Sequence, residues 1–271
     1  MEHLTDYHVH LPHYEKEAVP GVLERARRAG VGRVVTLGMD LEESRASVEL
    51  AEAHSGVYAG VGVHPWRASR PLPQEEVAAF RALASKKCVV AIGEVGIDRY
   101  GSGVVGGVLN RGNAFPLDVQ RAVLRQMIQL AREVGKPLVL HGRMSYRELL
   151  DFLRAEKVGA PGGVRGVVHD FTGEEETALG LLAQGLYLSV TGAVTRPDSE
   201  CLKGVVRKIP LDRLLLETDS PARQSISHMN ERNEPAFLTE TVETLASVYG
   251  LSAEEIALRT EENLHRFLGL S

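Results

Sequence analysis

Short apolar runs recur along the chain and alternate with longer segments of helical periodicity. The runs are rich in valine and leucine, whereas most of the intervening segments carry the spacing of an amphipathic helix. Such alternation is typical of βα units that assemble into a parallel sheet. Eight runs can be counted, at residues 6–10, 31–39, 57–64, 89–98, 137–143, 164–171, 186–192 and 213–219.

Several of these runs are apolar at successive positions, which indicates strands buried on both faces. Leu138-Val139-Leu140 and Leu214-Leu215-Leu216 are examples. The strands of a closed barrel have this pattern, because helices cover one face and the barrel interior covers the other. Eight such strands predict an α/β fold, a TIM-type (β/α)8 barrel that forms a single domain over residues 1–271.

Helix boundaries support the same order of elements. Sequences of the form S/T-x-x-E predict capping boxes at residues 145–148, 172–175 and 252–255. Glycines also fall where helices should end, and glycine adopts the left-handed C-cap conformation at low cost. Residues 101–115 carry no such signals. They are rich in glycine, and they predict a long loop after the fourth strand, either passive or involved in shaping the substrate site.

Composition narrows the class of protein. A chain of 271 residues that is 44% hydrophobic can bury a substantial core, and the formal charge of −5 mildly disfavours a protein that coats DNA. Cys88 and Cys201 lie far apart, so neither a disulfide framework nor a zinc ribbon is indicated. No leader-like segment and no apolar run of about 18 residues occurs. We therefore expect a soluble cytoplasmic protein without membrane association or an obligate protein partner.

Two histidines at the end of the first run are the first candidate metal ligands. His8 and His10 are two residues apart, and residues i and i+2 of a strand project from the same face. Both imidazoles can therefore reach one ion. The pair alone is equally compatible with two histidines that merely lie in a strand, so the remaining ligands must come from elsewhere.

Further ligand-type residues fall at the ends of other runs. In a barrel of this class the active site is assembled from the carboxyl ends of the strands. Each residue alone could have a structural role, but two carboxylates buried among apolar strands would be costly without compensating cations. The mixture of nitrogen and oxygen ligands favours zinc, manganese or related ions over calcium. The residues in question are Glu94, His141, His169 and Asp219.

At these residues the chain resembles the TatD family of metal-dependent hydrolases, within the amidohydrolase superfamily. The resemblance spans essentially the whole chain, and the motifs follow the family's order. They are Asp6-x-His8-x-His10, Gly62-Val63-His64-Pro65, Gly93-Glu94-Val95-Gly96-Ile97-Asp98, His141-Gly142-Arg143, His169-Asp170-Phe171-Thr172-Gly173, Glu217-Thr218-Asp219-Ser220-Pro221 and Arg232-Asn233-Glu234-Pro235. The resemblance implies a TIM-type barrel, a binuclear centre of divalent ions (Zn, Mn or Mg), and cleavage of phosphodiester bonds in DNA.

The resemblance also implies roles for individual residues. His8, His10, Glu94 and Asp219 would bind one metal ion, and Glu94, His141 and His169 the second, so that Glu94 bridges the two. Asp219 would orient or deprotonate the attacking water. His64 would act near the substrate as a hydrogen-bond donor or proton-transfer group. Arg143 would clamp a phosphate, with a salt bridge to an acidic barrel residue as the alternative. Asp98 and Asn233 are expected to order loops or orient ligand histidines.

Three departures from the family pattern concern the rim of the site. Asp170 stands where the family often has cysteine, residues 101–115 are longer than usual, and residues 221–224 differ from the common sequence. Because the ligand set is intact, hydrolysis remains the expectation while the substrate becomes less certain. A deoxyribonuclease acting on DNA is the leading hypothesis. The alternatives are a hydrolase of a small amide, lactone or ester, and a catalytically silent barrel that only binds metal or a partner.

Overall fold

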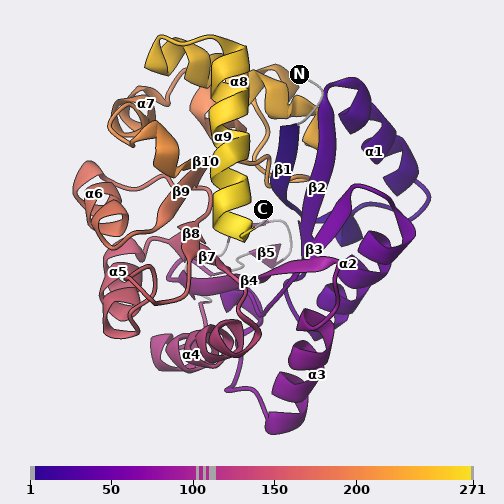
Figure 1. Ribbon diagram of the computed structural model, residues 1–271, viewed down its shortest axis with the longest axis vertical. Helices are drawn as coiled ribbons and strands as arrows, with labels where there is room; N and C mark the ends of the chain where they lie inside the picture. Colours follow the sequence, from indigo (N-terminus) through magenta and orange to yellow (C-terminus); the bar gives the residue numbers. More distant parts are fainter. Residues whose placement is uncertain (1–3, 102–103, 106–107, 110–113, 270–271) are drawn as a thin grey trace.

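Eight parallel strands form one sheet that curls into a barrel (Figure 1). The computed structural model describes residues 4–101, 104–105, 108–109 and 114–269. The strands follow one another around the barrel in sequence order, which confirms the predicted (β/α)8 fold. They are β1 (Leu4–Val9), β2 (Val31–Leu37), β3 (Val57–Val61), β4 (Val89–Asp98), β7 (Leu138–Arg143), β8 (Gly166–Val168), β9 (Tyr187–Val190) and β10 (Leu214–Leu216).

The barrel closes where β1 meets the segment that follows β10. The amide of Asp219 donates to the carbonyl of His8 (3.0 Å), and the amide of His10 donates to the carbonyl of Ser220 (2.8 Å). Backbone hydrogen bonds therefore fix the first and last strand ends beside each other. This places the HxH segment directly against the segment that carries Asp219.

Helices surround the strands and cover their outer faces (Figure 1). Short 3-10 segments mark several of the loops at the strand ends. The α-helices are α1 (Val19–Arg28), α2 (Leu41–Ala53), α3 (Gln74–Ala84), α4 (Leu117–Val134), α5 (Tyr146–Ala155), α6 (Glu175–Ala183), α7 (Glu200–Val206), α8 (Leu238–Tyr249) and α9 (Ala253–Leu268). In the described part of the chain, none combines the length and the apolar composition needed to cross a membrane.

Helix α9 crosses the barrel at the amino ends of the strands. Its side chains Leu264 and Phe267 join the apolar cluster that fills the barrel interior, together with inward residues such as Tyr7 and Val139. Phe267 is fully buried. Figure 1 shows this helix, in yellow, lying across the strands. The amino end of the barrel is thus sealed, and the opposite end is left for the site.

The local predictions were partly wrong. Ser252 caps α9 by accepting from the amide of Glu255, as the capping box predicts. Ser145 precedes α5, but its hydroxyl instead donates to the carbonyl of Ile97 (2.6 Å). Helix α6 begins only at Glu175, with Glu174 at the N-cap, so residues 172–175 do not form a capping box. At Ser145 a tertiary hydrogen bond replaces the expected cap, and at residues 172–175 the helix begins later than the sequence pattern predicts.

The segment after β4 is not entirely a loop. Two short strands, β5 (Val104–Val105) and β6 (Val108–Leu109), pair antiparallel within it. The predicted loop is therefore corrected at these residues, while residues 102–103, 106–107 and 110–113 lie outside the described part of the chain.

Candidate metal centre

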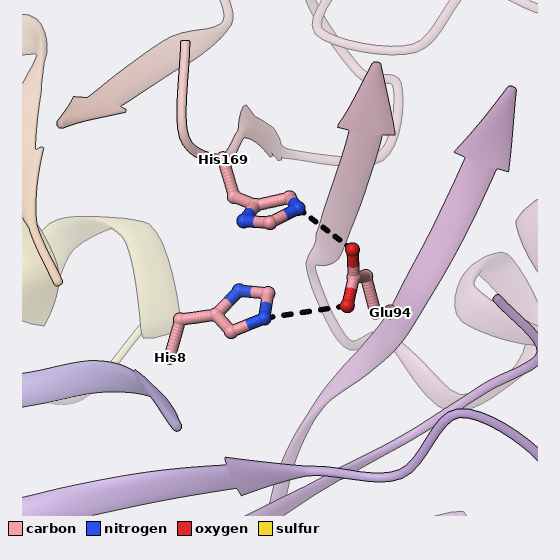
Figure 2. A group of neighbouring side chains, drawn as sticks. All are labelled: His8, Glu94 and His169. Carbon is pink, nitrogen blue, oxygen red and sulfur yellow. Dashed lines mark ion pairs between the residues drawn. The ribbon is translucent and has the colours of Figure 1, made fainter. Parts of the chain in front are cut away.

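The six predicted ligands converge at the carboxyl ends of the strands, around the carboxylate of Glu94. In Figure 2 this carboxylate lies beside the imidazoles of His8 and His169, with one oxygen toward each. Oε2 lies 3.3 Å from Nε2 of His8 and 3.4 Å from Nε2 of His10. Oε1 lies 2.7 Å from Nδ1 of His141 and 2.7 Å from Nε2 of His169. The two oxygens of one carboxylate therefore face two different pairs of histidines.

Asp219 completes the group around His8 and His10. Its Oδ1 lies 3.6 Å from Nε2 of His8 and 3.4 Å from Nε2 of His10. Asp219 has φ +53°, a conformation that side-chain-bearing residues rarely adopt and that tends to occur at functional sites. Its side chain is 14% exposed, whereas that of His8 is fully buried. The carboxylate thus sits at the floor of the open end of the barrel.

Hydrogen bonds to the far nitrogens aim the histidines into this group. Nδ1 of His10 donates to the carbonyl of Leu37 (3.0 Å), so Nε2 is the nitrogen that faces the site. Nε2 of His141 donates to Oδ2 of Asp98 (2.9 Å), so Nδ1 is the nitrogen that faces Glu94. These hydrogen bonds fix the ring orientations, and the site-facing nitrogens are the ones that would lose their protons to bind a metal ion.

Asp98 is tied into place by further donors. Its Oδ2 also accepts from Nε1 of Trp66 (2.8 Å), and its Oδ1 accepts from the amides of Tyr100 (2.6 Å) and Gly101 (2.9 Å). Burial alone would raise the pKa of Asp98, but the hydrogen bond from His141 and those from the two amides lower it to about 2. Asp98 is thus an ionised carboxylate that both orders the loop after β4 and orients His141.

Glu217 lies behind two of the histidines, a placement that the sequence reasoning did not assign. Its Oε2 is 3.4 Å from Nδ1 of His8, and its Oε1 is 3.6 Å from Nδ1 of His169. Oε1 also accepts from the hydroxyl of Ser189 (2.8 Å). One carboxylate therefore faces the rear nitrogens of two stacked imidazoles, whose other nitrogens face Glu94. The i, i+2 spacing of Glu217 and Asp219 was the available signal.

His64 differs from the other histidines because its Nδ1 accepts a hydrogen bond. The amide of Trp66 donates to it at 3.0 Å, so the proton resides on Nε2, which lies 3.2 Å from Oε1 of Glu94. Burial lowers the pKa of His64 to about 4. The structure therefore presents a buried, neutral imidazole whose N–H faces Glu94 and which lines the cavity above the ligands.

Arg143 does not form the salt bridge that was the alternative to phosphate binding. Its guanidinium lies over the ring of Tyr100, 4.2 Å from the ring centroid. Within the described residues no carboxylate lies within salt-bridge distance of it. The side chain also lines the cavity above the metal ligands. Its N–H donors are thus held at the site by an aromatic face rather than by an anion.

The charges of the site compensate one another closely. Burial opposes charge on His10, but hydrogen bonds to Asp219 and Glu94 outweigh burial and raise the pKa of His10 to about 10. Burial would likewise raise the pKa of Glu94, yet the charge of His169 and hydrogen bonds from His10 and His141 hold it well below its ordinary value. The buried carboxylates therefore favour positive charge next to them, and divalent ions supply more of it than imidazolium groups do.

The spacing of the ligand atoms fits small divalent ions. Nε2 of His8 lies 3.2 Å from Nε2 of His10, and Nδ1 of His141 lies 3.1 Å from Nε2 of His169. With metal–nitrogen bonds of about 2.0–2.1 Å, neighbouring ligands of a tetrahedral ion lie about 3.3 Å apart. His8, His10 and Asp219 could hold one ion, and His141 and His169 a second, with one oxygen of Glu94 for each.

A further histidine lies at the rim without having been predicted. The His13 ring stacks on that of His10, with centroids 5.1 Å apart, and its Nε2 is 3.2 Å from Oε2 of Glu43. The three side chains form another grouping of ligand-type atoms. Only the recurrence of histidine three positions after His10 could have indicated it.

Comparisons with known proteins agree with this architecture. A family model described as TatD related DNase matches residues 5–269. The chain is 38% identical over 270 residues to the uncharacterized metal-dependent hydrolase TatD of Mycobacterium tuberculosis, covering 98% of each chain. It is 35% identical over 251 residues to the 3'-5' ssDNA/RNA exonuclease TatD of Cronobacter sakazakii, covering 90% of this chain and 89% of that one. The structure of YJJV, a TatD homolog from Escherichia coli K12, matches with a TM-score of 0.86 at 25% identity, over 99% of this chain and 98% of that one.

Proposed function

Because the chain belongs to the TatD-related DNase family of metal-dependent hydrolases, we propose that it is a deoxyribonuclease that cleaves phosphodiester bonds of DNA with two divalent metal ions. The observation that carries the proposal is the position of Glu94. One of its oxygens faces His8 and His10 and the other faces His141 and His169. A carboxylate so placed is suited to bridge two ions.

The ligands of the proposed centre come from several strand ends and their adjoining loops, so the barrel sets the spacing. The first ion would be held by His8, His10, Glu94 and Asp219, and the second by Glu94, His141 and His169. Two such ions would lower the pKa of the attacking water and neutralise charge that develops on the phosphoryl oxygens. Zn, Mn and Mg are the candidate ions, and the imidazole-rich set favours Zn or Mn.

The chain's own residues would move the proton and position the phosphate. Oδ1 of Asp219 faces His8 and His10, which leaves Oδ2 to accept the proton of the attacking water. His64 carries a proton on Nε2 at the mouth of the site and would donate a hydrogen bond to a phosphoryl oxygen or to the leaving oxygen. Arg143 would hold a non-bridging phosphate oxygen through its guanidinium, for which its fork of donors is suited.

The name of the Cronobacter relative, a 3'-5' ssDNA/RNA exonuclease, supports nucleic acid as the substrate class and a free end of a single strand as the point of attack. The anionic substrate would approach a cavity of about 400 Å³ lined by His10, His64, Trp66 and Arg143. This volume is in the range of small-molecule sites, about 300–1,000 Å³, and suits one nucleotide rather than a duplex.

The experiment that tests this proposal is a comparison of substrates. Protein reconstituted with Mn²⁺ or Zn²⁺ is incubated with end-labelled single-stranded DNA and, separately, with a panel of cyclic amides, lactones and esters. Release of mononucleotides from DNA is expected, abolished in Asp219→Asn and retained in Asp212→Asn, an exposed aspartate outside the site. Turnover of the small compounds alone would replace the nuclease proposal with a small-molecule hydrolase. Binding of two ions without any turnover would indicate a catalytically silent barrel.

A further inference from the structure

A second cavity adjoins the one above the metal ligands. Its volume is about 650 Å³, and it lies over the loops that follow β7 and β8. The two cavities share several lining residues, so they meet at those side chains across the carboxyl end of the barrel. The shared residues are His141, Arg143, His169, Asp170 and Arg223. A substrate longer than one nucleotide has room to extend from the metal ligands into the second cavity.

Guanidinium groups and apolar surfaces line this second cavity. Arg143 covers the ring of Tyr100, and Tyr146 also lines this cavity. Met144, which is 71% exposed, adds an apolar surface. Cations next to flat apolar faces are what a single nucleic-acid strand requires, because its phosphates need charge and its bases need surfaces to stack on.

Most of the charges around the cavity are neutralised in pairs. Arg99 is paired with Glu148 (2.6 Å), and Arg147 lies 3.3 Å from Glu174, which also lines the cavity. These ion pairs are exposed, so replacing them by contacts with a phosphate costs little free energy.

Asp170 and Arg223 form an ion pair that borders both cavities. Nη2 of Arg223 lies 2.7 Å from Oδ2 of Asp170, while Oδ1 of Asp170 accepts from the hydroxyl of Thr191 (2.8 Å). Nε of Arg223 lies 3.8 Å from Oδ2 of Asp219. Asp170 and Arg223 both have positive φ, +43° and +58°. Asp170 and the segment 221–224 were two separate departures from the family pattern. In the structure they contact each other through the Asp170–Arg223 ion pair, although their loops are distant in the sequence.

The contact fixes the guanidinium without using all of its donors. The Asp170 side chain is 6% exposed, whereas that of Arg223 is 31% exposed and lines both cavities. No hydrogen bond within the described residues engages Nη1 of Arg223. Asp170 therefore holds one edge of the guanidinium and leaves other donors of Arg223 available in the cavities that it lines.

We propose that Arg223, positioned by Asp170, binds the phosphate next to the scissile one and directs the nucleic-acid strand from the metal centre into the second cavity. The inference rests on the proposed nuclease function and adds the path of the strand to it. Arg143, which also lines both cavities, lies on the same path. Arg223 is thus a substrate-binding residue specific to the polymeric form of the substrate, and Asp170 is a positioning residue.

The test compares two substrates that differ in the neighbouring phosphate. Oligo(dT) has one, and thymidine 5'-(p-nitrophenyl phosphate) has only the scissile diester. Arg223→Ala is expected to raise KM for oligo(dT) on the order of tenfold, the scale of one lost charge-assisted hydrogen bond, with a clearly smaller change for the mononucleotide diester. The salt dependence of log KM for oligo(dT) should become shallower by about 0.7, as for one lost phosphate contact to a single strand. Arg223→Lys should recover part of the loss.

Asp170→Asn tests the positioning role. It is expected to raise KM for oligo(dT) in the same direction, and to add little in the double variant with Arg223→Ala, because Asp170 acts through Arg223. Arg81→Ala removes a surface arginine paired with Glu133 on the outer helices and serves as the control for a general loss of charge. Its KM and salt dependence should match those of the wild type.

The outcomes separate this inference from the proposed function. If wild-type protein does not cleave oligo(dT), both are overturned. If it does, and Arg223→Ala leaves KM and salt dependence unchanged, the strand path alone is overturned. An equal loss on both substrates would also overturn it, because Arg223 would then act on the metal centre through Asp219.

Discussion

Replacing Asp98 by asparagine is expected to weaken the binding of one metal ion and to leave the binding of the other unchanged. In the native site Oδ2 of Asp98 accepts from His141 and Trp66, and Oδ1 accepts from two backbone amides. The asparagine side chain would have one acceptor oxygen, so in either orientation its NH2 group would face two donors. Where the NH2 group replaces Oδ2, His141 can relieve the contact only by moving its proton from Nε2 to Nδ1. That nitrogen faces Glu94, and a proton there excludes a metal bond.

The magnitude follows from these contacts. Loss of the group that orients a ligand histidine typically lowers metal affinity about 10- to 100-fold. With the NH2 group in place of Oδ2 the N–H of Trp66 would also lose its acceptor, and in the other orientation the amides of Tyr100 and Gly101 would lose theirs; a lost buried acceptor costs about 1–3 kcal/mol of folding free energy. The ion held by His8, His10 and Asp219 should keep its affinity, because none of these side chains contacts Asp98 among the described residues.

Chelator-competition titration of Asp98→Asn measures the affinity for each of the two metal ions. Thermal unfolding of the metal-free protein measures the loss of folding free energy. Glu148→Gln is the matched control, since it neutralises a nearby carboxylate that pairs with Arg99 and not with a ligand histidine. Two ions bound with wild-type affinity would refute the role of the Asp98–His141 hydrogen bond. An equal loss of affinity for both ions would refute the proposed division of the ligands between them.

Other substitutions test the remaining parts of the site and the barrel. His8→Ala should lower the bound metal from two ions toward one while the far-ultraviolet circular dichroism is retained; full stoichiometry and activity would contradict the ligand assignment. Gly96→Ala should destabilise by about 3 kcal/mol or more, because a Cβ there would lie 2.0 Å from the carbonyl oxygen of His141. Gly135→Ala, with φ +68° and open space, should cost only about 1–2 kcal/mol in the same unfolding measurement. Lys136→Met should lower stability by about 1–3 kcal/mol without changing metal affinity, since Nζ donates to three backbone carbonyls near the start of β4; an unchanged melting temperature would count against this.

The fold and the convergence of the six ligand-type residues followed from periodicity, because the carboxyl ends of parallel strands share one edge. The apolar runs located every strand of the barrel, although β8 is only three residues long where residues 164–171 were predicted. Beyond Val168 the regular strand ends, although the amides of His169 and Phe171 still donate to the carbonyls of Leu140 and Ser189 (both 2.9 Å). Asp170 between them has φ +43°, a local break that the hydrophobic pattern does not indicate.

Pairs of distant polar residues were beyond the reach of the sequence. Asp170 stood out as an added negative charge and Arg223 as part of a divergent segment, but nothing local indicated that they meet at 2.7 Å. The same holds for Glu217 behind His8 and His169. Such contacts depend on loop conformation at the rim, where positive φ values at Asp170, Asp219 and Arg223 break regular geometry.

The seal at the amino end of the barrel bears on how the protein is made. Helix α9 follows all of the barrel strands in the sequence, so the ribosome synthesises the strands before the helix that covers their amino ends. Until then the interior side chains around Tyr7 lack the cover of Phe267. The helix also joins the two extremes of the sequence, since Glu261 accepts from the amide and hydroxyl of Thr5. Before α9 is synthesised, the apolar interior of the barrel is therefore exposed at its amino end. In this incomplete state aggregation competes with folding.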